Sequence, residues 1–96
     1  MPTYGRLARF LAEYERLPAA QRQAFMRAVS AFVADLDSGA PPRPALRVKR
    51  VVSHPGIWEM WAADGRATFE YGDEVIPGQP HIIWRRIGTH DIFRNP

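Results

Sequence analysis

Hydrophobic positions near the start of the chain recur at helical spacing. Leu7, Phe10, Leu11 and Tyr14 form one apolar stripe, which predicts a first helix over residues 3–17. Thr3 is placed to cap its start. The helix is expected to end before Pro18, because the residue before a proline disfavours helical geometry. We therefore expect the first ordered element of the chain to be a helix.

A second helix is expected directly after the first. Pro18 suits its first turn, and Asp37-Ser38-Gly39 marks its end, with prolines at 41, 42 and 44 opposing its resumption. Because the connection is so short, we expect an antiparallel helix hairpin. The stripe of this helix consists of Phe25, Ala28, Val29, Phe32, Val33 and Leu36, of which Phe25, Val29, Phe32 and Val33 are expected to be buried.

From residue 45 onward the apolar period changes to two. Strands are predicted over residues 45–52, 57–62, 66–71 and 81–87. Turn signals lie at residues 54–56 and 63–65, a loop spans residues 72–80, and Gly88 begins a short tail. This order predicts one α+β domain over residues 1–96, in which the helix hairpin packs on one face of a four-stranded, mainly antiparallel sheet.

Alternation along the strands divides the sheet into two faces. Trp58, Met60, Ala67, Phe69 and Tyr71 are expected to face the helices. The opposite, helix-free face is called the open face below, and it is expected to be concave and basic. Its expected residues are Arg47, Lys49, Glu59, Trp61, Arg66, Thr68 and Glu70.

Composition narrows the functional classes. The chain has 96 residues and a formal charge of +3, and Lys49 is its one lysine among thirteen basic residues. Arginine suits phosphate because its fork is flat and permanently charged, although a basic cluster is usually just a solvated surface. Cysteine is absent, which excludes disulfides and thiolate metal sites. No apolar run approaches the roughly 20 residues that span a bilayer, so a cytoplasmic protein is expected.

Several catalytic classes lack their motifs. The three histidines are far apart and no HExxH pattern occurs, so no metal or other cofactor is expected. No serine lies in a nucleophile elbow, and no phosphate-binding glycine loop occurs. What remains is metal-free chemistry on a charged substrate.

The open face offers each group that metal-free RNA cleavage requires. Such cleavage needs a base for the 2′-hydroxyl, cations for the phosphorane and an acid for the departing 5′-oxygen. Glu59 or Lys49 is the candidate base, and His90 is the candidate acid. Arg66 is the candidate phosphate clamp, expected to be largely exposed, and it acts with Arg85 or Arg86. Arg47 and the Trp61 ring are further candidate RNA contacts.

Structural explanations stand beside these roles. Glu59 can pair with Arg66 across the hairpin, and Lys49 can simply be solvated. Arg85 and Arg86 are expected to point to opposite faces, so that only one reaches the site. His90 can stabilise a turn with Asp91. His81 opens a strand with no evident partner.

The segments "ALRVKRV", "GIWEM", "GRATFEY" and "HIIWRRIGTH", following two helices, resemble the RelE/ParE superfamily of bacterial type II toxins. The resemblance covers roughly residues 7–93. It implies a toxin neutralised by a cognate antitoxin, and in the RNase branch a metal-independent enzyme that cleaves mRNA on the ribosome. By position, Lys49, Glu59, Arg66 and His90 match the family's functional residues.

A second function fits the same resemblance. Many nucleases of the family carry a tyrosine near the C-terminus, where this chain has Phe93. The ParE branch blocks a protein target such as DNA gyrase without cleaving RNA. The clustering of Glu59, Arg66 and His90 favours the nuclease, and the missing tyrosine favours the binder. An acidic antitoxin segment is expected to dock on the open face.

Overall fold

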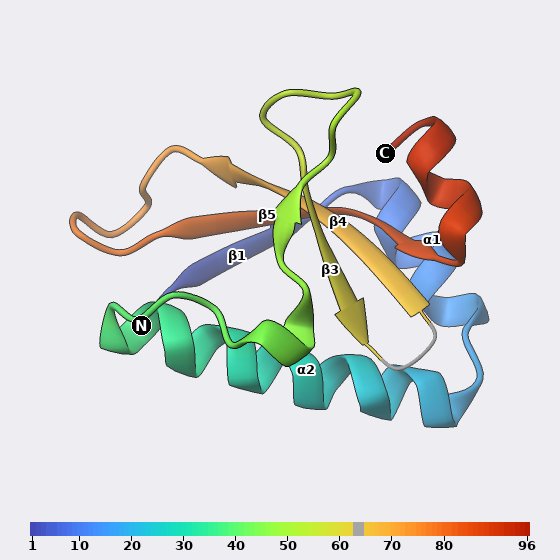
Figure 1. The fold of residues 1–96 in the computed structure, drawn as a ribbon, viewed down its shortest axis with the longest axis horizontal. Helices are drawn as coiled ribbons and strands as arrows, with labels where there is room; N and C mark the ends of the chain where they lie inside the picture. The colour runs from blue at the N-terminus through green and yellow to red at the C-terminus, as the bar shows by residue number, and fades with distance from the viewer. Residues whose placement is uncertain (63–64) are drawn as a thin grey trace.

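The computed structural model describes residues 1–62 and 65–96 and shows an α+β fold built on a five-stranded sheet (Figure 1). The strand order is β1-β5-β4-β3-β2, with β1 parallel to β5 and the other neighbours antiparallel. No helix in this part of the chain is long and apolar enough to cross a membrane. The elements are β1 (Thr3–Arg6), α1 (Ala8–Arg16), α2 (Ala19–Ser38), η1 (Pro44–Leu46), β2 (Lys49–Arg50), β3 (Trp58–Ala62), β4 (Gly65–Gly72), β5 (His81–Gly88) and η2 (His90–Arg94).

The first ordered element is a strand, so the prediction of a helix from residue 3 was wrong. The backbone N–H of Thr3 donates to the carbonyl of Pro80, just before β5, at 3.0 Å, and that of Leu7 donates to the carbonyl of Trp84 within β5, at 2.9 Å. Thr3 also hydrogen-bonds the ring of His81 at 2.7 Å, which gives this histidine the partner that its sequence context did not reveal. Thr3 therefore belongs to the sheet and caps no helix. The predicted four-stranded sheet becomes five-stranded.

The second helix has the predicted limits. Pro18 precedes its first turn, and Gly39 ends it with a left-handed φ of 75°. Phe25 and Phe32 are buried as expected, but Val29 and Val33 are only partly buried. These two valines line an apolar cavity of about 170 Å³ between α1, α2 and β1.

The core is an aromatic cluster between the helices and the sheet. Phe10 of α1 and Phe25 of α2 both pack on Trp84 of β5, with ring centroids 6.1 and 5.2 Å away. Phe32 is fully buried and lies 5.2 Å from Phe69. The two helices therefore lie on one sheet face and meet through aromatic rings. The predicted alternation holds for Met60, Ala67 and Phe69, whereas Tyr71 is 44% exposed at the end of the sheet.

The segment predicted as a strand over residues 45–52 is mostly irregular. Residues 44–46 form the 3-10 turn η1, and Arg47 follows with a left-handed φ of 49°. Only Lys49 and Arg50 pair with β3. The left-handed residue breaks the extended backbone, although Leu46 still enters the core as the alternation requires.

A clamp holds the proline-rich segment before η1 against α2. The Arg43 guanidinium donates to both carboxylate oxygens of Asp35, at 3.0 and 2.8 Å, and the Arg43 backbone N–H donates at 2.9 Å. These hydrogen bonds hold the pKa of Asp35 at about 2. The clamp fixes the position of Arg43 against α2 and therefore the path of the chain toward Arg47.

This clamp predicts an acid-dependent contribution to stability. The Asp35 carboxyl has a pKa of about 2 in the folded chain against 3.8 as its ordinary value, so the folded state binds the proton less tightly. The stabilisation is complete above the ordinary pKa and is lost as pH falls through the folded pKa. Urea midpoints of wild type and Arg43→Ala should therefore converge between about pH 5 and about pH 2. A gap between the two proteins that stays constant over this range would contradict the role of the clamp.

The C-terminal segment folds back instead of trailing as a tail. After β5 it forms η2, whose Ile92 is buried, and Pro96 is buried beyond it (Figure 1). The Thr68 hydroxyl donates to the main-chain oxygen of Pro96 at 3.0 Å. Thr68 is therefore fully buried although it lies on the open face. Part of the open face is therefore covered by the segment after β5, whose position the sequence pattern does not predict.

Candidate functional site

The structure joins five of the open-face residues through a chain of contacts across β2, β3 and β4. Cross-strand register places Lys49 opposite Glu59 and Trp61 opposite Arg66. The guanidinium of Arg47, just before β2, lies over the indole ring of Trp61. All five were chosen from sequence. Their direct contact depends on a register that the sequence does not specify.

Glu59 lies at the base of this group. Its side chain is 9% exposed, and its Oε1 accepts a hydrogen bond from the Trp61 indole at 3.2 Å. The Lys49 ammonium lies 3.7 Å from the same oxygen and is 66% exposed. Across the β3–β4 pair, Glu59 faces Thr68 rather than Arg66. The carboxylate thus holds an indole and an ammonium, and the ammonium is the more accessible partner.

Two guanidinium groups lie over the ring of Trp61. The Arg66 Cζ is 3.2 Å from the ring centroid, and the Arg47 Cζ is 4.5 Å away. The Arg66 Nη1 also donates to the carbonyl of Gly65 at 3.1 Å. Arg66 is half-buried, so the expectation of a largely exposed side chain was wrong. The indole ring of Trp61 covers one face of this guanidinium.

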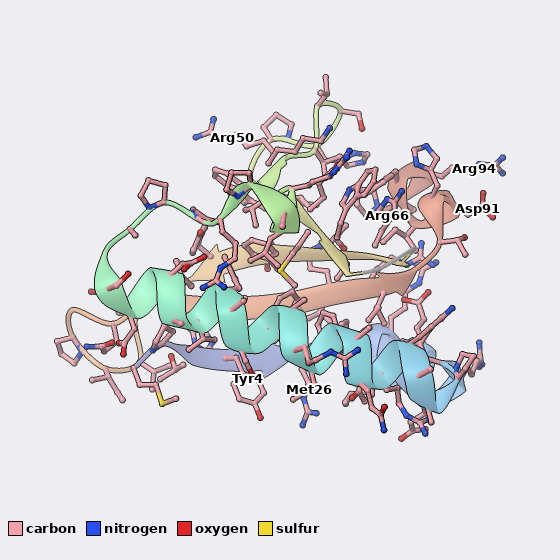
Figure 2. All side chains as sticks on the ribbon, turned by 60° about the horizontal axis from the view of Figure 1, so that its bottom comes forward. Tyr4, Met26, Arg50, Arg66, Asp91 and Arg94 are labelled. Carbon is pink, nitrogen blue, oxygen red and sulfur yellow. The ribbon has the colours of Figure 1, made fainter. Side chains whose placement is uncertain are left out.

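Figure 2 shows on which side of the sheet these groups lie. Arg66, Asp91 and Arg94 lie on the side away from α2, whereas Tyr4 and Met26 point away on the helix side. Residues 63–64, within the turn predicted before β4, lie outside the described residues. The candidate site is therefore separated from the apolar cavity by the sheet.

His90 is brought to the same end of the sheet as Arg66. Gly88, the last residue of β5, is the register partner of Arg66, and His90 begins η2 two residues later. The imidazole is exposed and stacks edge-on against Phe93 at 5.0 Å. Phe93 thus orients the histidine through its ring and has no hydroxyl to offer.

A bulge brings both arginines of β5 to the C-terminal segment, so the expectation that they point to opposite faces was wrong: Arg85 donates to the main-chain oxygen of Pro96 and Arg86 to that of Asn95, both at 3.2 Å. Thr68 pairs with Arg86 and Phe69 with Trp84, which leaves Arg85 as the extra residue. Arg85 donates to Glu70 and to the main-chain oxygen of Pro96, both at 3.2 Å, on the open face. Arg86 forms a two-point ion pair with Glu13 of α1, at 3.2 and 2.7 Å. Sequence reasoning missed this ion pair, because 73 residues separate its members and no local pattern marks them.

Metal ligands do not gather in the part of the chain described here: residues 1–62 and 65–96 contain no group of three His, Cys, Asp or Glu side chains arranged to hold an ion. At the candidate site, the groups available for chemistry are the cations of Arg47, Lys49 and Arg66, the carboxylate of Glu59 and the imidazole of His90. They suit binding of an anionic substrate and transfer of protons.

The sequence matches no protein-family model and no curated protein. Several solved structures align with this chain over most of its length. The RelE toxin in the RelB-RelE complex of Methanococcus jannaschii aligns with a TM-score of 0.63 at 13% identity, covering 95% of each chain. The chain has the RelE fold.

Two proteins of E. coli extend this likeness. YafQ aligns with a TM-score of 0.62 at 14% identity, over 95% of this chain and 96% of YafQ. The isolated RelE toxin aligns with a TM-score of 0.61 at 16% identity, over 93% of this chain and 84% of RelE. The likeness to the RelE fold thus extends over 93–95% of this chain.

Proposed function

We propose that this chain is the toxin of a type II toxin–antitoxin system and cleaves mRNA on the ribosome without a metal ion. The observation that carries the proposal is the assembly of Lys49, Glu59, Trp61 and Arg66 on the helix-free face of a RelE fold, with His90 at the same end of the sheet. The solved neighbours with this fold include the RelE toxin and YafQ, which was also solved in a toxin–antitoxin complex with DinJ.

The proposed cleavage is an attack by the ribose 2′-oxygen on the adjacent phosphorus. The new 2′-O–P bond closes a cyclic phosphate as the bond from phosphorus to the 5′-oxygen breaks. The Glu59 carboxylate of the Lys49–Glu59 pair takes the proton from the 2′-hydroxyl, and His90 donates one to the departing 5′-oxygen. Arg66 stabilises the charge that builds on the non-bridging oxygens.

The remaining basic residues are assigned by their accessibility. Arg47 is exposed beside Trp61 and is proposed to bind the RNA backbone, with Trp61 forming one wall of the site. Arg85 lies on the open face, where hydrogen bonds to Glu70 and Pro96 hold its guanidinium group. Arg86 is 15% exposed and paired with Glu13, so its contribution to RNA binding is expected to be the smaller of the two.

Primer extension on mRNA from expressing cells tests the proposed activity. Cuts should appear at positions in phase with the codons and should depend on translation. The same cleavage in a purified ribosome–mRNA complex should persist when the toxin has been treated with EDTA and freed of the chelator before mixing, so that the Mg²⁺ that holds the ribosome together is kept. Growth arrest without mRNA cuts, accompanied by inhibited DNA gyrase, would replace the nuclease with the ParE-like function.

The His90→Ala variant tests the proposed acid. A general acid is worth about 10²–10⁴ in rate, and water replaces part of it, so cleavage should slow toward the lower end of this range. Phe93→Leu keeps the imidazole but removes the ring that orients it, so this variant should slow cleavage less than His90→Ala does. An unchanged rate for His90→Ala would assign the proton to another group.

We further propose a cytoplasmic protein held inactive by a cognate antitoxin. Two of the neighbouring toxins were solved as complexes with antitoxins, RelB-RelE and DinJ-YafQ. An acidic antitoxin segment on the open face would neutralise Lys49, Arg47 and Arg66 and exclude RNA from them. A homo-oligomer or a hetero-oligomer with the antitoxin is compatible with this arrangement.

A further inference from the structure

Trp61 is surrounded by groups that fix its ring rather than by open space for a base. Its indole N–H donates to Glu59 at 3.2 Å, and that carboxylate is 9% exposed and paired with Lys49. A ring bound through a buried carboxylate has one preferred orientation. The sequence suggests a stacking platform for RNA, but the observed contacts tie this ring to the protein.

Arg66 takes its position from that ring. It is the direct cross-strand partner of Trp61, and its guanidinium carbon lies 3.2 Å from the ring centroid. Cations are attracted to the face of an indole more strongly than to other aromatic rings. The stack therefore restricts an otherwise flexible side chain to one place above β3 and β4.

Arg47 brings a second cation to the same ring through an unusual backbone. Its φ of 49° is one that residues with side chains seldom adopt, and its guanidinium lies 4.5 Å from the Trp61 centroid. The Asp35–Arg43 clamp and the η1 turn hold the chain on its approach to this residue. With two guanidinium groups over the indole, an RNA base would have to displace a cation to stack there.

We propose that Trp61 is a positioning residue for the cleavage reaction: it holds the Arg66 guanidinium in place for the phosphorane and does not act by stacking on RNA. Glu59 fixes the orientation of the ring. This inference rests on the proposed nuclease function. It adds that the rate contributed by Arg66 depends on the ring beneath it.

A double-mutant cycle in the ribosome–mRNA cleavage assay tests the proposal. Trp61→Leu should lower the rate constant at saturating substrate about tenfold, within the range of a partly desolvated cation–π contact, and change KM less than about twofold. In an Arg66→Ala background, Trp61→Leu should cause no further loss, because the group that it positions is gone. Trp61→Phe should keep most of the rate, because it retains an aromatic face. Equal losses in both backgrounds, or a rise in KM that depends on the base at the cut, would overturn the proposal.

Trp58→Leu is the matched control for loss of a strand tryptophan. Trp58 lies on the other sheet face and carries Arg50 at 5.2 Å, so this variant should leave the rate constant at saturation unchanged. Thermal unfolding of each variant identifies any loss that arises from misfolding.

A measurement without RNA separates this inference from the proposed function. A guanidinium over an indole should show upfield ring-current shifts of the Arg66 side-chain NMR signals. The shifts should vanish in Trp61→Leu and persist in Trp61→Phe, with the chain folded in each case. Normal shifts in wild type would overturn the inference. Shifted signals in a wild-type protein that cleaves no mRNA would instead contradict the nuclease function.

Discussion

The Phe32→Ala variant should lose about 3–5 kcal/mol of its free energy of unfolding. Phe32 is fully buried at the centre of α2 and packs against Phe69 and Trp84, with ring centroids 5.2 and 6.3 Å away. Truncation removes the transfer free energy of a whole ring and leaves a cavity between two layers that cannot collapse freely. A domain of this size has about 5–15 kcal/mol in total, so the variant approaches unfolding.

Urea unfolding monitored by circular dichroism measures this loss. Met26→Ala on the same helix is the control, because Met26 is 52% exposed and surface substitutions usually change stability by about 0.5 kcal/mol or less. Equal midpoints for Phe32→Ala and wild type would show that the buried face of α2 is assigned wrongly.

Elements with a continuous local pattern could be predicted from sequence. The α2 limits follow from Pro18 and Gly39, and its deepest residues, Phe25 and Phe32, lie on the apolar stripe. The division of β4 into a buried face with Ala67 and Phe69 and an opposite face follows from alternation. In both cases the period of the backbone is recorded in neighbouring residues.

The elements that were missed depend on distant partners. The β1 strand pairs with β5, about 78 residues away, and its four residues carry no strand pattern of their own. The β2 strand has two residues because Arg47 adopts a left-handed φ, which nothing in the surrounding Val and Lys residues signals. The burial of Thr68 likewise depends on Pro96, which folds back over the sheet.

Sequence reasoning reached the composition of the candidate site but not its internal contacts. Glu59, Trp61 and Arg66 were assigned to one face by alternation alone. The choice between Arg66 and Lys49 as the partner of Glu59 needed the register of β2 on β3. The bulge at β5 also replaced a simple alternation of Arg85 and Arg86 with two separate ion pairs. Register and bulges are set by the assembled sheet, which is why these contacts were not predictable.

The Arg66→Ala variant should relieve growth inhibition at equal expression. A preorganised donor facing a charge that develops in the transition state is worth about 2.7–4 kcal/mol, or a factor of about 10²–10³ in rate. Arg66 meets the condition of preorganisation, because the indole of Trp61 lies 3.2 Å beneath its guanidinium carbon and Gly65 accepts from its Nη1. The half-buried stack also contributes to folding, so a stability loss of about 0.5–2 kcal/mol is expected, well below the total.

The measurement pairs colony counts after induction with the cleavage rate on the ribosome and with thermal unfolding. Arg27→Ala is the control: it removes one exposed arginine from α2, on the helix side of the sheet, and should remain toxic. Arg66→Lys separates charge from shape, because an ammonium retains the charge but lacks the flat fork that stacks on an indole, so it should restore only part of the rate. Full toxicity of a folded Arg66→Ala protein would remove the phosphate clamp from this face. The end of the sheet where Arg66 of β4 pairs with Gly88 of β5 would then be assigned to binding a protein target, as in the ParE-like function.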